Sequence, residues 1–190
     1  MSRPSPKIST NRTENRDLLV VFPSPLGWIA IVGSGRLLKR VTFAHPSLEA
    51  AIGALEGEVL QNATRGRWND QLVQRLKAYA RGNRDDFLDV KIDLAGLSDF
   101  RRRVVEQCRR IPLGQTMTYG ELAAKAGFAR AARAVGSCMA ANRLPLIVPC
   151  HRVVPSSGGV GPFSAPGGSR TKQRLLALEV HRCQSGQGGT

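Results

Sequence analysis

Apolar residues in the first half of the chain form short runs that turn-forming residues separate. The runs cover residues 18–22, 28–32 and 37–43, and segments rich in Pro, Gly and Ser lie between them at 23–27 and 33–35. This pattern is typical of an antiparallel meander of strands. Residues 88–94 alternate apolar and charged side chains, which predicts a further half-buried strand.

Two segments of the same half have helical spacing instead. Residues 46–60 place Leu48, Ile52, Leu55 and Val59 on one face, and residues 69–81 do the same with Leu72, Leu76 and Tyr79. Gly82 follows the second segment and is suited to end it, because glycine readily adopts the left-handed conformation after a helix.

The second half is predominantly helical. A helix over 100–111 has an apolar face at Phe100, Val104, Cys108 and Ile111, and Pro112-Leu113-Gly114 ends it. Thr118-Tyr119-Gly120-Glu121 reads as a capping box that starts a helix reaching about Ala126. A turn at 127–129 and a second helix at 130–141 complete a predicted helix-turn-helix. A last helix is expected over 171–181.

These patterns predict an α+β protein with two units. We expect a disordered basic tail at 1–16, an α/β domain with an antiparallel sheet at 17–95, a mostly helical domain at 96–183 and a flexible tail at 184–190. The chain has 28 Lys and Arg against 14 Asp and Glu. Residues 96–190 hold 14 basic and 4 acidic side chains, so this half has a net charge of +10 and is the half that would attract phosphates.

Composition excludes several classes of protein. The four cysteines show no Cys-x-x-Cys spacing, and the first domain has no cysteine and a single histidine, His45, so we expect neither a metal nor a cofactor. No signal peptide or apolar stretch of membrane-spanning length is present. We expect a monomer with reduced thiols in the cytoplasm, associated with the nucleoid in a bacterium or in the nucleus of a eukaryote.

Candidate chemistry centres on Pro149-Cys150-His151-Arg152-Val153, which follows the strand-like apolar run 144–148. A thiol with the ordinary pKa of about 8.5 needs a neighbour that favours the thiolate, and His151 is the available base. Adjacent residues of a strand point to opposite faces, so His151 would need a bend after Pro149 or a bridging water to reach Cys150. The alternative is an inert buried thiol.

A third group should orient the imidazole, and the second half offers four carboxylates. Glu121 belongs to the capping box and Asp99 to a helix start, which leaves Glu106 and Glu179, and Glu179 is on the helix nearest in sequence.

The helix at 131–141 has almost exclusively small side chains and one long cation, Arg133. This composition would permit a close approach to a minor groove with Arg133 inserted into the base stack. It is equally typical of a tightly packed core helix.

Together these residues resemble the O6-alkylguanine-DNA alkyltransferase family. The similarity covers most of 97–181 and depends on the segments 118–123, 131–136, Asn142, 147–154, 156–164 and 172–179. It implies a first domain of ribonuclease-H-like layout and suicidal repair of duplex DNA that contains O6-alkylguanine, with O4-alkylthymine as a second substrate. The guanine would be flipped out of the duplex.

The resemblance also implies roles for individual residues. Cys150 would accept the alkyl group, His151 would take the thiol proton through a water, Glu179 would polarise His151, and Asn142 would shape the turn. Tyr119 would press on the phosphate and donate toward the purine, the Cys150 and Val153 carbonyls would accept from the guanine amine, and the Ser164 N–H would donate to the substrate oxygen. Arg133 would fill the gap that the flipped base leaves. Contacts to DNA would come from Thr118, Ala132, Ala134, Gly136 and Ser137.

The chain departs from the family at two points. Phe163 stands where a tyrosine is usual, which keeps an apolar wall and removes a hydroxyl, and the 165–170 connection is slightly longer. Two other hypotheses remain open from sequence: a Cys-His hydrolase of the papain type, and a helix-turn-helix regulator with an incidental thiol.

Overall fold

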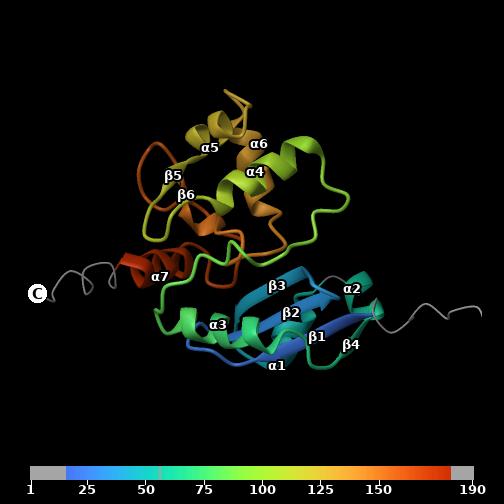
Figure 1. Ribbon diagram of the computed structural model, residues 1–190. Helices are drawn as coiled ribbons and strands as arrows, with labels where there is room; N and C mark the ends of the chain where they lie inside the picture. The colour runs from blue at the N-terminus through green and yellow to red at the C-terminus, as the bar shows by residue number, and fades with distance from the viewer. Residues whose placement is uncertain (1–15, 56, 181–190) are drawn as a thin grey trace, which may run out of the picture.

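The computed structural model describes residues 16–55 and 57–180, without the side chains of 58–60. Most of the predicted first tail (1–15) and all of the predicted second tail (184–190) lie outside the described residues. A sheet forms the lower part of the molecule and helices of the second half lie above it (Figure 1).

Strands β1 (Asp17–Phe22), β2 (Trp28–Ser34) and β3 (Leu37–His45) form the predicted antiparallel meander. The short strand β4 (Ala63–Arg65), which the sequence pattern did not reveal, pairs in parallel with β1. The order is therefore β3-β2-β1-β4. Because successive side chains alternate between faces, Ile29 and Ile31 enter the main core while Ala30 and Val32 pack with Ala51 and Leu55 on the opposite face.

The prediction of one helix over 46–60 is wrong, because two short helices occupy this segment. These are α1 (Leu48–Gly53), whose first turn Ser47 caps, and α2 (Gly57–Asn62). Gly53 and Gly57 lie at the interruption, where the low helix propensity of glycine favours a break. The predicted helix over 69–81 is confirmed as α3 (Asp70–Ala80), and Gly82 follows it at φ 93°.

The prediction of a strand over 88–94 is also wrong. Only Ile92 forms a bridge, with Leu38. Side chains of Asp85 and Asp86 accept from the backbone N–H groups two residues on, which folds the segment into turns. Arg109 donates to the carbonyls of Phe87, Leu88 and Val90, so these groups are bound to a side chain and not to a neighbouring strand.

The helices of residues 96–180 follow the predicted pattern; this stretch is named the second unit, and residues 16–95 the first unit, after the predicted division. These helices are α4 (Asp99–Arg109), α5 (Tyr119–Lys125), α6 (Ala132–Ala140) and α7 (Ser169–Val180). The capping box is confirmed: Thr118 Oγ1 accepts from the Glu121 N–H, and the Glu121 carboxylate accepts from the Thr118 N–H. Two-residue strands β5 (Met117–Thr118) and β6 (Val153–Val154) pair in parallel.

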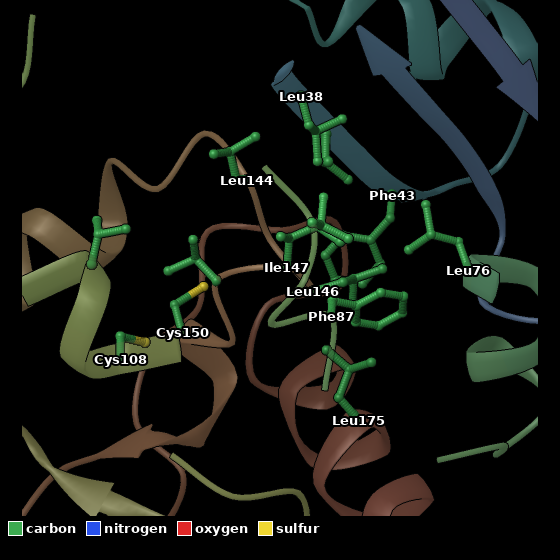
Figure 2. Packing of buried hydrophobic residues seen from close by; sticks show 14 of the residues in the cluster. Leu38, Phe43, Leu76, Phe87, Cys108, Leu144, Leu146, Ile147, Cys150 and Leu175 are labelled. Carbon is green, nitrogen blue, oxygen red and sulfur yellow. The ribbon is translucent and has the colours of Figure 1, made fainter. Parts of the chain in front are cut away.

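The two units share one apolar core. In Figure 2, Leu146 and Ile147 lie below Leu38 and Phe43 of β3, and Leu175 of α7 lies beneath them. Backbone hydrogen bonds also cover the outer edge of β3, and one of them joins the two units. Leu38 bonds with Lys91 and Asp93, and the Val41 N–H donates to the Arg143 carbonyl. The second unit is therefore fixed against the sheet.

Candidate active site

A sharp double turn presents Cys150. The run 144–148, which the sequence suggested as a strand, is a series of turns with Leu146 at φ 73°. Pro149, at φ −78° and ψ 64°, forms an inverse γ-turn in which the Cys150 N–H donates to the Val148 carbonyl at 2.8 Å. The 3-10 turn η1 (Cys150–Arg152) follows at once. This geometry contains a bend after Pro149, which was one of the two expected routes from His151 to Cys150, the other being a bridging water.

Asn142 holds the turn and the sulfur together. Its Nδ2 donates to the Val148 carbonyl at 2.9 Å and to Cys150 Sγ at 3.1 Å, while its Oδ1 accepts from the Leu144 N–H at 3.0 Å. Burial raises the pKa of the Cys150 thiol, although the hydrogen bond from Asn142 and the charge of Lys172 act in the opposite direction. The resting group is therefore a protonated thiol that needs a base.

His151 faces a buried carboxylate. Its Nε2 lies 2.8 Å from Glu179 Oε1, and both side chains are buried. Burial lowers the pKa of His151 although Glu179 acts to raise it, so the imidazole is neutral. Because a carboxylate only accepts, Nε2 holds the proton and Nδ1 presents a lone pair. This Nδ1 is buried and has no hydrogen-bond partner among the described residues.

Of the four carboxylates that the sequence offered, Glu179 is the one beside His151. Glu106 is exposed on α4, Glu121 is part of the α5 cap, and Asp99 pairs with Arg103. Burial acts to raise the pKa of Glu179, but hydrogen bonds from His151 and Arg152 outweigh it and hold that pKa well below the usual carboxyl range. Glu179 is therefore an anion in the core.

Further donors surround this carboxylate. Arg152 binds it through Nε and a terminal nitrogen at 2.8–3.2 Å, the Gly114 N–H donates at 3.1 Å, and the Tyr79 hydroxyl donates at 2.6 Å. Tyr79 comes from α3 in the first unit. Sequence reasoning assigned no role to Arg152, and it took Tyr79 for a core position, because neither pattern nor spacing reveals contacts across 27 and 100 residues.

Lys172 is a second buried cation that the sequence did not single out. Its Nζ donates to the Val153 carbonyl at 2.6 Å and lies 5.9 Å from the centre of the Tyr119 ring. Burial lowers the pKa of Lys172, and the proximity of Cys150 acts to raise it. Burial of Lys172 was not expected, because lysine is rarely found in a core. The only sequence signal for a role at the site was its position inside the segment 172–179.

A cavity of about 650 Å³ opens beside Cys150. Eight residues that the sequence analysis selected line it: Thr118, Tyr119, Ala132, Arg133, Gly136, Cys150, Phe163 and Ser164. The other selected residues are not part of its lining: Val153, His151 and Glu179 are buried, Asn142 is half-buried, and Ala134 and Ser137 are exposed on α6. Phe163 forms one wall and meets Phe43 of β3 edge to face, with ring centres 6.3 Å apart.

Helix α6 has one packed face and one open face. Val135, Cys138 and Met139 are buried, whereas Arg133, Ala134 and Ser137 are exposed. A Cβ atom added to Gly136 would meet nothing within 4 Å. The packing explanation therefore accounts for one side of the helix, and the protein itself does not require a glycine on the other.

Neither a metal centre nor a membrane span is found in the part of the chain that the structure describes. In that part no three His, Cys, Asp or Glu side chains form a group that could hold an ion, and no helix is long and apolar enough to cross a bilayer.

The fold and the site define a protein with a buried cysteine at a cavity that residues of α5 and α6 line, and with a His-carboxylate pair that begins at the next residue. Residues 99–181 match the family model described as the 6-O-methylguanine DNA methyltransferase DNA-binding domain. A methylated-DNA–protein-cysteine methyltransferase from Mycolicibacterium paratuberculosis is 35% identical over 162 residues, which is 82% of this chain and 88% of the relative. The chain therefore belongs to the methylated-DNA–protein-cysteine methyltransferase family.

Solved structures agree with this assignment. Mycobacterium tuberculosis OGT in complex with DNA is 33% identical with a TM-score of 0.73, and the match covers 87% of this chain and 94% of that one. The O6-methylguanine-DNA methyltransferase of Pyrococcus kodakaraensis is 26% identical with a TM-score of 0.65, over 86% and 98% of the two chains. Mixed α/β content with an antiparallel sheet is common to all of them.

Proposed function

We propose that this protein repairs DNA by moving the alkyl group of O6-alkylguanine onto Cys150. The observation that supports this most directly is the position of Cys150 at a cavity, with Asn142 on its sulfur and His151 and Glu179 behind it. A bond forms between Sγ and the alkyl carbon while the bond from that carbon to O6 breaks. The thioether is stable, so each molecule reacts once.

His151 is the base for this step. The proton of the Cys150 thiol passes through a water to the lone pair on His151 Nδ1, and Nε2–H keeps its bond to Glu179. Glu179 stabilises the imidazolium that forms, as the carboxylate does in other nucleophile–base–acid sets. A raised thiol pKa and a neutral histidine suit a mechanism in which the proton leaves as the attack occurs.

The cavity would hold the extruded base. Tyr119 contacts the phosphate and donates toward the purine, Phe163 is the apolar wall, and the Ser164 N–H donates to O6, which makes guanine a better leaving group. The Cys150 and Val153 carbonyls accept from the exocyclic amine. The Val153 carbonyl already accepts from Lys172, and a carbonyl oxygen has a second lone pair for the substrate.

Helices α5 and α6 act as a helix-turn-helix on the minor groove. Arg133 enters the base stack and compensates for part of the unstacking energy, which is roughly a few kcal/mol. Small residues Ala132, Ala134, Gly136 and Ser137 allow the backbone to approach, and Thr118 lies at the cap of α5. The excess positive charge of this half supplies attraction that does not depend on sequence. O4-alkylthymine is a second substrate of the same kind.

Two finer features of the proposal concern the whole chain. The sheet order β3-β2-β1-β4, with β4 parallel to β1, supports a ribonuclease-H-like layout for the first unit. Reduced, unpaired cysteines at 108, 138 and 150 support a cytoplasmic or nuclear location.

Intact-protein mass spectrometry tests the function. Duplex DNA with one O6-methylguanine should add one methyl group to the protein, and Cys150→Ser should abolish the gain. Cys138→Ala is the matched control, because Cys138 is another buried cysteine but lies outside the cavity lining, and it should retain the gain. Folded protein that binds the duplex but gains no mass refutes the proposal. Multiple turnovers would indicate a hydrolase, and sequence-specific binding without transfer would indicate a regulator.

A further inference from the structure

The first unit contributes one buried polar group to the site. Tyr79 lies on α3, about seventy residues before Cys150, and is 2% exposed. Its hydroxyl donates to Glu179 Oε1 at 2.6 Å and lies 3.4 Å from His151 Nε2. The oxygen that accepts from Tyr79 is the same oxygen that lies 2.8 Å from His151 Nε2.

We propose that Tyr79 is a positioning residue that limits the basicity of His151 by sharing the charge on Glu179 Oε1. This inference depends on the proposed function, in which neutral His151 receives the thiol proton. A hydrogen bond to a carboxylate stabilises its charge and reduces how strongly the same oxygen attracts another donor. The hydroxyl therefore keeps the imidazole neutral at the pH where the protein acts.

The surroundings of Tyr79 suit this role. Its ring packs edge to face on Phe87 with centres 5.6 Å apart, so the direction of the hydroxyl is fixed by packing as well as by the bond. Burial and the charge of Glu179 raise the pKa of Tyr79 well above its usual value, so the hydroxyl stays a donor throughout the physiological range. A donor that cannot ionise is suited to hold a neighbouring anion.

Other charges near His151 act alongside Tyr79. Glu179 of α7 raises the pKa of His151, while Arg152 of η1 and Lys172 of α7 lower it. Cys150 precedes His151 in η1, and the thiol of Cys108 on α4 is fully buried near Cys150 and Arg152. Arg152 also donates to Glu179 Oε1, at 2.8 and 3.2 Å, so the Tyr79 hydroxyl adds to a charge that Arg152 already shares, whereas Lys172 donates to the Val153 carbonyl.

Tyr79→Phe in the full chain tests the proposal by removing the hydroxyl and keeping the ring. The assay is the single-turnover rate of methyl transfer from O6-methylguanine duplex between pH 5 and 9, normalised to the active fraction measured by mass. We expect the midpoint of the acid limb to rise by roughly one pH unit, which lowers the rate about tenfold below the midpoint and leaves the alkaline plateau within about twofold. An unchanged midpoint refutes the role of Tyr79.

Two controls separate the possible causes. Phe87→Leu disturbs the packing of the Tyr79 ring without touching the hydroxyl, and should lower stability with no shift of the midpoint. Glu179→Gln should move the midpoint to lower pH, since it removes the anion that raises the pKa of His151. If Glu179→Gln leaves the midpoint unchanged, the proposed relay fails. If only Tyr79→Phe leaves it unchanged, the relay stands and the inference about Tyr79 fails.

A second probe is available if Tyr79→Phe yields little folded protein. The chain has two tyrosines, so fluorotyrosine incorporated in a Tyr119→Phe background changes only Tyr79. Fluorine makes the phenol a stronger donor, and the midpoint should then move to lower pH than in unlabelled Tyr119→Phe protein. No shift, or a shift to higher pH, refutes the proposal.

Discussion

Replacing Glu179 with Gln should be among the most destabilising single changes in this molecule. Arg152 is 2% exposed and forms three contacts of 2.8–3.2 Å with Glu179. Breaking a buried ion pair from one side costs about 3–5 kcal/mol, because the remaining charge stays in the core without its partner. Gln keeps an acceptor oxygen, so we expect about 3 kcal/mol, which is a large part of a typical free energy of unfolding.

The cost should depend on pH in a defined direction. The folded-state pKa of Glu179 is lowered, so its stabilisation is complete above the unfolded value of about 4.3 and is lost as the pH falls toward the folded value. The difference between the parent protein and Glu179→Gln should therefore be full at pH 7. It should shrink by about 1.4 kcal/mol for each pH unit below about 4.

Urea unfolding followed by circular dichroism at pH 7, 4 and 3 measures both effects. Glu106→Gln is the matched control, because it makes the same change on the exposed surface of α4 and should cost less than about 0.5 kcal/mol. A loss below about 1 kcal/mol for Glu179→Gln at pH 7 would contradict the reasoning. So would a loss that stays constant down to pH 3, since it could not then come from the charge.

Three further outcomes follow from the cavity and its loops. Arg133→Ala should lower the repair rate on duplex roughly tenfold or more and the reaction with free O6-alkylguanine base less than about twofold, because only the duplex requires extrusion; equal losses in a mass-based rate assay would remove the proposed role. Gly136→Ala should stabilise α6 by about 0.5–1 kcal/mol in urea unfolding, since the added Cβ meets nothing. Gly136→Leu should weaken binding to duplex about tenfold in fluorescence anisotropy. Undiminished binding by Gly136→Leu would show that DNA does not approach this face of α6. Gly161→Ala should cost about 1 kcal/mol more than Gly158→Ala, because both glycines have positive φ but only at Gly161 would the Cβ meet Pro155, at 2.7 Å; equal costs in urea unfolding would mean that the Pro155 ring yields.

Local patterns predicted most of the secondary structure because local forces determine it. The apolar face of α4, the Thr118 cap and Gly82 each act within one or two turns of helix, so residue spacing reveals them. Predictions failed where a distant side chain decided the outcome. The conformation of the alternating segment 88–94 is determined by hydrogen bonds from Arg109 and by turns at Asp85 and Asp86. No pattern within the segment contains that information.

The site was predictable for the same reason only in part. Cys150 and His151 are adjacent, and Glu179 is one of only four carboxylates in the second half. Residue types alone therefore left few candidates for the nucleophile, the base and the carboxylate that orients the base. A bend after Pro149 was one of two alternatives considered from sequence, and its form, an inverse γ-turn, was not predicted. Tyr79, Arg152 and Lys172 are buried polar groups whose partners lie 19–100 residues away, and such contacts depend on the tertiary arrangement.

The hydrogen bonds along the outer edge of β3 have a consequence for aggregation. An exposed strand edge is a template for pairing with other chains, and β3, nine residues long, is the end strand of the sheet. Lys91, Asp93 and Arg143 occupy backbone groups on that edge, while the opposite end strand, β4, has only three residues. The segments that hold Lys91, Asp93 and Arg143 therefore protect β3 from intermolecular strand pairing, and a fragment that stops before residue 91 should aggregate where the full chain remains dispersed.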